Sequence, residues 1–188
     1  MYPVKPYSEE DYRKARYAEQ YLSCFFTKLE VRARRTEFDT DIQLWKNGQL
    51  VALVDVEVKH SWRSHEWPQH WQTAHFTLRK FKYANGKPHF QVVFNEHYDN
   101  AYVGFTPEIV KAHVTIIGST IFEKDAFYDM PLSQVGFGLE GIEPFITEKL
   151  KHIHRNHTTF HHDIPTGQLF CIEDGLPKEA HSYVGGSE

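Results

Sequence analysis

The chain has 188 residues with a mass of 22.1 kDa, a formal net charge of −4 and a pI near 6.3. Apolar residues make up 40% of it, which is sufficient for one hydrophobic core and, at this length, for a single domain. The acidic balance excludes strong non-specific binding of nucleic acid by the whole surface, because such binding depends on neutralising phosphates with lysine and arginine. Two cysteines are too few for a disulfide framework or a zinc ribbon, so we expect free thiols in a reducing compartment.

The sequence contains no uninterrupted apolar span of the roughly 20 residues that a membrane helix needs. Its first residues, Met1 to Pro6, do not have the pattern of a signal peptide. We therefore expect a soluble, cytoplasmic protein with no membrane partner. The oligomeric state stays open, with a homodimer as one alternative.

The first third of the chain has the pattern of one helix followed by three strands. Residues 9–26 keep helical apolar spacing, and residues 29–34 alternate between apolar and charged side chains as in a strand. Residues 41–59 have the pattern of a hairpin with Asn47-Gly48 at its turn. Its second strand begins with an unbroken apolar run, Leu50 to Val54, which is typical of a strand buried on both faces.

The end of that second strand carries an acidic and basic face. Asp55, Glu57 and Lys59 alternate with three valines, so the charged side chains project to one side and the valines to the other. Residues i and i+2 lie about 6.6 Å apart along a strand, close enough for two carboxylates to converge on one ion. Charges within such a strand are costly unless they are paired or bound to a metal. The arrangement suits a hard metal ion beside a phosphate.

The loop length of the hairpin decides which residues share this face. A two-residue loop would put Asp41 opposite Val54, on the valine side. A three-residue loop, Lys46–Gly48, would pair Asp41 with Leu53 and put it on the same side as Glu57. We expect the three-residue loop, because its register also gathers the apolar side chains of both strands on the other face.

The middle of the chain is predicted to contain a helix and two strands. The spacing of Trp71, Ala74, Leu78 and Phe81 predicts a helix that ends in a turn at Asn85-Gly86. Residues 90–94 and 102–105 have the pattern of two strands joined by a polar loop. Thr106-Pro107-Glu108 predicts a helix start, with the threonine as cap.

The last third of the chain has a weaker pattern. Residues 114–117 are predicted to form a strand and residues 143–154 a helix, while residues 163–188 have the composition of an irregular tail. We therefore expect one α/β domain over residues 1–162. The histidines between His152 and His162 are interpreted as a polar helix end, because no third ligand is placed for a zinc site.

Residues 41–59 resemble the core motif of the PD-(D/E)xK, or restriction-endonuclease-like, nuclease superfamily. That motif consists of an aspartate that opens a strand, a turn, and a strand that ends in acid-x-lysine. Asp41 stands in the place of the first aspartate, Glu57 and Lys59 stand in the acid-x-lysine places, and Thr40 stands where the family's proline would be. The resemblance covers residues 8–105. It implies an α/β fold with a mixed central sheet flanked by helices. A helical C-terminal extension is expected to follow this fold.

The same resemblance implies a Mg²⁺-dependent nuclease that cleaves DNA, with Mn²⁺ as a substitute ion. Asp41 and Glu57, with Asp55 as a further ligand, would hold the metal. Lys59 would orient the attacking water or stabilise the developing negative charge. Asp39 and Asp55 remain alternatives to Asp41 and Glu57 as ligands.

Several other side chains are weaker candidates. Glu19, in the first helix, is a supporting catalytic candidate, because related nucleases place an acid there, although a solvated helix residue is the simpler interpretation. Trp62 and Trp67 are expected to pack in the core and not to stack on bases. Basic residues on both sides of the motif are candidates for binding the DNA backbone: Arg32, Arg34, Arg35, Arg79 and Lys80.

A second hypothesis comes from a different functional class. The chain would then be a catalytically silent, nuclease-like module that binds nucleic acid or a protein partner. The acidic net charge favours this alternative, whereas an intact set of two acids and a lysine disfavours it, because a scaffold has no need to bury such a costly group.

Overall fold

The structure is a computed structural model that describes residues 9–33, 40–77, 87–117 and 125–155. The chain divides into two units, Met1–Thr158 and Thr159–Glu188, and all described residues belong to the first. Within it the elements follow in the order α1 (Glu9–Phe25), β1 (Glu30–Ala33), β2 (Ile42–Lys46), β3 (Gln49–Lys59), β4 (Thr73–Thr77), β5 (His89–Asn95), β6 (Ala101–Phe105), α2 (Thr106–Ile109), β7 (His113–Ile117), β8 (Asp125–Pro131), the 3-10 helix η2 (Leu132–Gln134), β9 (Gly136–Phe137) and α3 (Leu139–Arg155).

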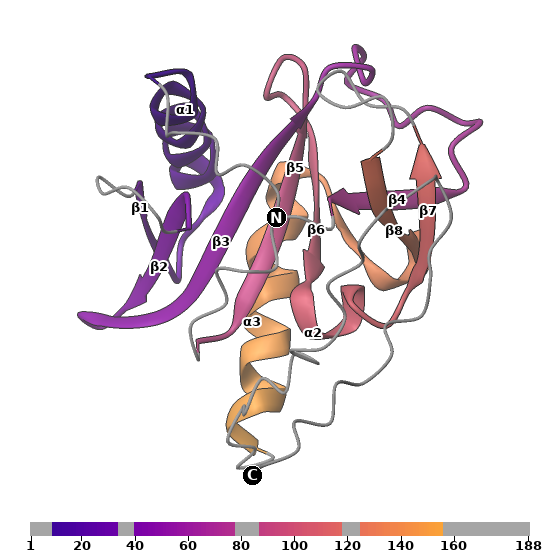
Figure 1. Cartoon of the computed structure of the whole chain (residues 1–188). Coiled ribbons are helices and arrows are strands. Elements are labelled where there is room, and N and C mark those ends of the chain that lie inside the picture. The colour runs from indigo at the N-terminus through magenta and orange to yellow at the C-terminus, as the bar shows by residue number, and fades with distance from the viewer. Residues whose placement is uncertain (1–8, 34–39, 78–86, 118–124, 156–188) are drawn as a thin grey trace, which may run out of the picture. The chain divides into compact units, whose positions relative to one another are not determined.

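Six of these strands form a mixed sheet in the order β1-β2-β3-β5-β6-β9, and β4, β8 and β7 form a separate antiparallel sheet (Figure 1). In the larger sheet β3 and β5 pair in parallel, and the other described pairs are antiparallel. Parallel neighbours need a crossover connection, and this one runs from Lys59 to His89 and contains β4. The predicted α/β class with a mixed sheet is confirmed.

One face of the larger sheet, which we call the valine face, is packed against helices. Val54, Val56, Val92 and Val103 of three neighbouring strands are fully buried on it. α1 and α3 contact each other and the strands of this sheet. The packing of α3 is close, since a Cβ atom added to Gly136 of β9 would lie 2.8 Å from Phe145. The helices therefore cover the valine face and leave the charged face of β3 on the other side.

The opposite face, which we call the acidic face, packs in part against the smaller sheet. Val93 and Tyr102 of this face join Phe76 of β4 and Ile109 of α2 in one apolar cluster. A Cβ atom on Gly104 of β6 would lie 2.5 Å from a ring carbon of Phe76 and 2.8 Å from Ile109. Glycine is therefore required here for the two sheets to approach each other.

Glu143 of α3 fastens the turn between α1 and β1. Its carboxylate accepts the backbone N–H groups of Thr27 at 3.0 Å, Lys28 at 2.6 Å and Leu29 at 2.8 Å, and the Thr27 hydroxyl at 3.1 Å. Burial would raise the pKa of Glu143, but these donors outweigh it and hold the pKa below its ordinary value of 4.5. The charged form of this side chain is therefore part of the fold.

Most predicted elements of the described residues are confirmed. The helix over residues 9–26, the strands at 29–34, 90–94 and 102–105 and the strand at 114–117 correspond to α1, β1, β5, β6 and β7. The predicted helix over residues 143–154 is also present, and it begins four residues earlier, at Leu139. α2 begins at Thr106 with Pro107 in its first turn, but its N-cap residue is Phe105, so the prediction of Thr106 as the cap is wrong.

The predicted helix beginning at Trp71 is wrong, because residues Thr73–Thr77 form β4. Ala74 and Phe76 alternate with more exposed neighbours and are fully buried, which is the period of a strand and not of a helix. Pairing with β8, which the sequence pattern did not predict, stabilises β4 as a strand. The predicted turn at Asn85-Gly86 and the predicted tail, 163–188, lie outside the described residues. None of the described helices is both long and apolar enough to cross a membrane.

We predict that Glu143→Gln lowers the free energy of unfolding by about 2 to 4 kcal/mol at pH 7, because one buried and two partly buried N–H donors lose a charged acceptor. The folded-state pKa of Glu143 is depressed, so its contribution is present above the unfolded pKa and is lost as the pH falls through the folded pKa. Urea denaturation at pH 7 and below pH 4 measures both effects. Glu140→Gln, at an exposed position of the same helix, is the control, and an equal loss in both variants would contradict the prediction.

Candidate functional site

The turn between β2 and β3 contains two residues, Asn47 and Gly48, with positive φ angles of 50° and 75°. Lys46 and Gln49, on either side of them, form the last pair of the hairpin. These angles are those of a type I′ turn, in which Asn-Gly is a favoured pair. The predicted three-residue loop is therefore wrong.

A β-bulge follows this turn. Trp45 pairs with Leu50, but Leu44 pairs with Ala52, so Val51 is an additional residue in β3. An additional residue in one strand changes by one position which side chains stand opposite each other. The bulge therefore puts Asp41 on the same face as Glu57, which was the effect predicted for the longer loop.

Beyond the bulge, Ile42 pairs with Val54, and one further step puts Asp41 opposite Asp55. The predicted register had placed Asp41 opposite Leu53, two residues away. Asp41 is on the acidic face in both registers, because a shift of two residues preserves the face. The observed register brings it into the same row as Asp55.

Asp41, which is 4% exposed, directly precedes β2, and its side chain is held in place there. Its Oδ2 atom accepts a hydrogen bond from the backbone N–H of Val56 at 2.8 Å. That N–H belongs to β3, so the carboxylate replaces a backbone acceptor where the pairing of β2 with β3 ends. The orientation of Asp41 is thus determined by the backbone of the strand that carries Asp55 and Glu57.

Asp55 is 2% exposed and lies beside a buried histidine of the parallel strand. Its Oδ2 atom is 3.2 Å from Nε2 of His89, whose side chain is fully buried at the start of β5. The other ring nitrogen of His89, Nδ1, is 2.6 Å from the hydroxyl oxygen of Thr106. Asp55, His89 and Thr106 therefore form a connected polar group inside the protein, and two of its members are titratable.

Gln91 extends this group across the sheet. It pairs with Asp55 on one side and with Gly104 on the other, and its side chain is 1% exposed. Neither polar atom of its amide makes a hydrogen bond. Asp41, Asp55 and Gln91 thus stand in one row across β2, β3 and β5, which lie about 4.8 Å apart as neighbouring strands. We call these three residues the polar row.

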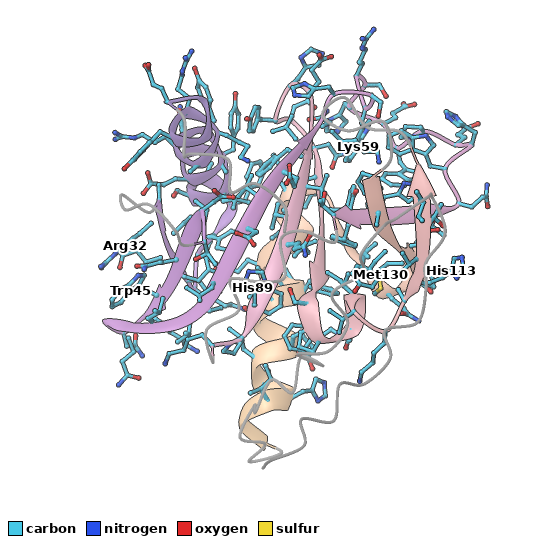
Figure 2. All side chains as sticks on the ribbon, viewed as in Figure 1. Arg32, Trp45, Lys59, His89, His113 and Met130 are labelled. Carbon is cyan, nitrogen blue, oxygen red and sulfur yellow. The ribbon has the colours of Figure 1, made fainter. Side chains whose placement is uncertain are left out.

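Glu57 and Lys59 continue the acidic face toward the end of β3. Both side chains are half-buried, in contrast with the polar row, so the face becomes accessible toward this end. Lys59 and His89 mark the two ends of this face in Figure 2. The predicted residues Asp41, Asp55, Glu57 and Lys59 are therefore brought to one face.

Lys59 meets the smaller sheet at this end. Its Nζ atom is 4.6 Å from the centre of the Trp71 ring, and Asp129 of β8 is close enough to stabilise its charge. Burial lowers the pKa of Lys59 to about 8, against the opposing effect of Asp129. His75 of β4 is 3.4 Å from Asp129, and burial followed by the charge of Lys59 lowers the pKa of that histidine. Lys59 remains mostly charged at neutral pH.

The other predicted candidates are not part of this group. Glu19 lies on α1, in the helical layer over the valine face, and its carboxylate accepts the backbone N–H of Ala33 at 2.7 Å. Arg32 lies on the edge strand β1, paired with Glu30 at 2.6 Å and stacked 4.5 Å from the centre of the Trp45 ring (Figure 2). The remaining predicted basic residues lie outside the described part of the chain: Arg34, Arg35, Arg79 and Lys80. So does Asp39.

The aromatic residues after β3 pack in the core. Trp62 is fully buried and stacks on Tyr102, with ring centres 6.0 Å apart, and Trp67 meets both rings edge-on. The prediction that these tryptophans pack in the core is confirmed.

Sequence reasoning missed His89 and Gln91. The predicted strand covered residues 90–94, one residue short of His89, and the available signal was that His89 and Gln91 are polar residues at alternate positions of an otherwise apolar strand. Nothing in the local pattern indicates that β5 pairs with β3, so the proximity of these residues to Asp55 could not be predicted.

Within the described residues, no group of three or more histidine, cysteine, aspartate and glutamate side chains lies close enough to hold a metal ion. The comparisons with known proteins add no assignment, because no family model, curated protein or solved structure matches the chain. The geometry of the acidic face is therefore the feature that indicates a function.

We predict that His89→Gln lowers the free energy of unfolding by about 3 to 5 kcal/mol, because it leaves the Asp55 carboxylate buried without its partner. The double variant Asp55→Asn/His89→Gln should recover a substantial part of this loss, since it removes the uncompensated charge. Chemical denaturation of the two single variants and the double variant gives the coupling energy. His113→Gln, at an exposed position of β7, is the control. Additive losses would show that Asp55 and His89 are not coupled.

Proposed function

We propose that the chain is a metal-dependent nuclease of the restriction-endonuclease-like type that hydrolyses phosphodiester bonds in DNA. The observation that carries the proposal is the register of β2 on β3. The bulge at Val51 puts Asp41 on the face of Asp55, Glu57 and Lys59, within a mixed sheet in which β3 has a parallel neighbour. The order of one helix, three antiparallel strands and a parallel strand also agrees with the resemblance, although β4 stands in the crossover where the resemblance implies a helix.

The donor set fits a hard divalent cation. Asp55 Oδ2 is buried and makes no hydrogen bond, although it lies 3.2 Å from His89, and a carboxylate oxygen in that condition is stabilised by a cation. Mg²⁺ is typically held by one or two carboxylates together with waters and substrate phosphates. Two of the carboxylates of Asp41, Asp55 and Glu57, together with waters and substrate phosphates, can therefore hold it, and the group of three that the described residues lack is not required. When bound, the ion would polarise the phosphoryl group and lower the pKa of a coordinated water.

The chain's own residues would contribute positioning and charge. Asp41 is oriented by the N–H of Val56, and Asp55 is buried 3.2 Å from Nε2 of His89, so the positions of both carboxylates are restricted before any substrate arrives. Lys59 lies at the more accessible end of the face and carries a positive charge at neutral pH. It would orient the attacking water or stabilise the negative charge that develops on the phosphate. The ring of Trp71 limits the positions that its ammonium group can take.

We predict that divalent ions stabilise the fold through this face. Binding to the folded state alone raises the free energy of unfolding by about 2.7 kcal/mol at a hundredfold excess over the dissociation constant. Thermal melts in Mg²⁺, Mn²⁺ and a chelator test this expectation. An unchanged melting temperature with every ion would contradict a metal site.

For catalysis, we predict different effects of two substitutions. Glu57→Ala should abolish metal-dependent nicking of supercoiled plasmid, because it removes a ligand. Lys59→Ala should retain the metal-induced stabilisation and slow cleavage by roughly 10²- to 10³-fold, because it removes one charge-stabilising donor. Glu66→Ala and Lys46→Ala, both at exposed positions, are the matched controls and should cleave at the wild-type rate.

Cleavage assays on the wild-type protein also distinguish the nuclease hypothesis from the hypothesis of a silent binding module. If it cleaves no single-stranded, double-stranded or branched DNA and no RNA in Mg²⁺ or Mn²⁺, the nuclease proposal fails. If it cleaves and Glu57→Ala cleaves equally well, the activity stands but this site does not.

A further inference from the structure

Gln91 is a buried amide whose hydrogen-bonding groups are not satisfied by the protein. It is 1% exposed, and neither its side-chain oxygen nor its nitrogen makes a hydrogen bond. Leaving a buried polar group unpaired is unfavourable, and an apolar side chain of the same size would avoid this. A ligand that is bound at this position would supply the missing partner.

The neighbours of Gln91 indicate which kind of ligand fits. Gln91 pairs with Asp55 in the parallel β3–β5 ladder, and residues paired in this way project to the same face. Asp55 has a buried carboxylate oxygen that makes no hydrogen bond, and Asp41 stands opposite it on the other side. Two carboxylates and one amide oxygen in a row across three strands are an all-oxygen donor set, which suits Mg²⁺, Mn²⁺ and Ca²⁺.

We infer that Gln91 is a metal ligand, and that the polar row of Asp41, Asp55 and Gln91 forms the buried side of the ion site. The row contains two acids and one amide. It is therefore compatible with the finding that no three acids, histidines or cysteines of the described residues are grouped closely enough to hold a metal ion. His89 lies 3.2 Å from Asp55 Oδ2 and makes no hydrogen bond to the amide of Gln91. The inference rests on the metal dependence of the proposed function and adds a ligand that the sequence motif does not contain.

The direct test is a titration of metal-free protein with Mn²⁺. Electron paramagnetic resonance measures the free Mn²⁺ at each step, which gives the amount bound. Gln91→Met keeps the length of the side chain and removes both polar atoms. We expect it to weaken Mn²⁺ binding by about tenfold or more, on the scale of losing a ligand or its immediate support. Gln49→Met, at an exposed position of β3, is the matched control and should bind as wild type.

Thermal melts of the same variants distinguish a ligand from a structural amide. In chelator, Gln91→Met should melt at a higher temperature than wild type, because an unsatisfied polar group has been removed, and Mn²⁺ should raise its melting temperature less. Gln91→Glu should show the opposite behaviour. A third carboxylate beside Asp55 should lower the melting temperature in chelator and increase the shift produced by Mn²⁺.

The possible outcomes keep this inference separate from the nuclease proposal. Wild-type Mn²⁺ affinity in Gln91→Met, or a lower melting temperature of that variant in chelator, would overturn the role of Gln91 even if the protein cleaves DNA. No Mn²⁺ binding by the wild type would overturn it as well. Gln91-dependent Mn²⁺ binding by a protein that cleaves nothing would support the ligand role and refute the nuclease.

Discussion

The additional residue at Val51 decides which side chains share each face of the large sheet. A regular hairpin with the observed two-residue turn would put Ile42 and Leu44 on the acidic face and Asp41 on the valine face. Burying an isoleucine or leucine side chain contributes about 1.5 to 3 kcal/mol to the free energy of unfolding. The bulge removes about one hydrogen bond between the strands, which costs roughly 0.5 to 1.5 kcal/mol. Apolar burial therefore favours the bulge, and the alignment of Asp41 with Asp55 is its consequence.

The acidic face is a place where the usual rules of core formation are not followed. It buries Asp55, His89 and Gln91 on the side of the sheet that also buries Val93 and Tyr102. Buried groups of this kind reduce stability unless they are paired, and natural proteins retain them at functional sites. Helix α3 contains a contrasting case. Glu143 is just as buried, yet its carboxylate has a full set of N–H donors.

The difference between Glu143 and Gln91 supports a functional interpretation of the polar row. Both side chains come from elements that contact neighbours on several sides, so the fold could have satisfied Gln91 as it satisfies Glu143. The hydrogen-bonding groups of Gln91 are instead left without partners, and Gln91 stands beside the buried carboxylate of Asp55. That pattern is expected where the partner is a ligand.

Local patterns were sufficient to predict much of this arrangement. The helical spacing of residues 9–26, the Asn47-Gly48 turn and the alternation at the end of β3 depend on neighbours in the sequence, and the corresponding elements are present. The second sheet was not predicted, because β4 is stabilised by β8 some fifty residues later, and a helical spacing of aromatic residues competed with its strand pattern. Gln91 and His89 were missed for the same reason, since only the parallel pairing of β3 with β5 brings them to Asp55.

The unpredicted sheet also determines the surroundings of the one basic residue of the motif. Lys59 ends β3 where the two sheets meet, and its charge is influenced by Trp71 before β4 and by Asp129 of β8. Burial alone would favour a neutral amine, whereas the carboxylate of Asp129 favours the ammonium form. The motif places the lysine beside the acids, but the long-range packing that brings Asp129 of β8 near it shifts its pKa. Fold and site chemistry are therefore coupled at this position, and a sequence motif by itself cannot describe them.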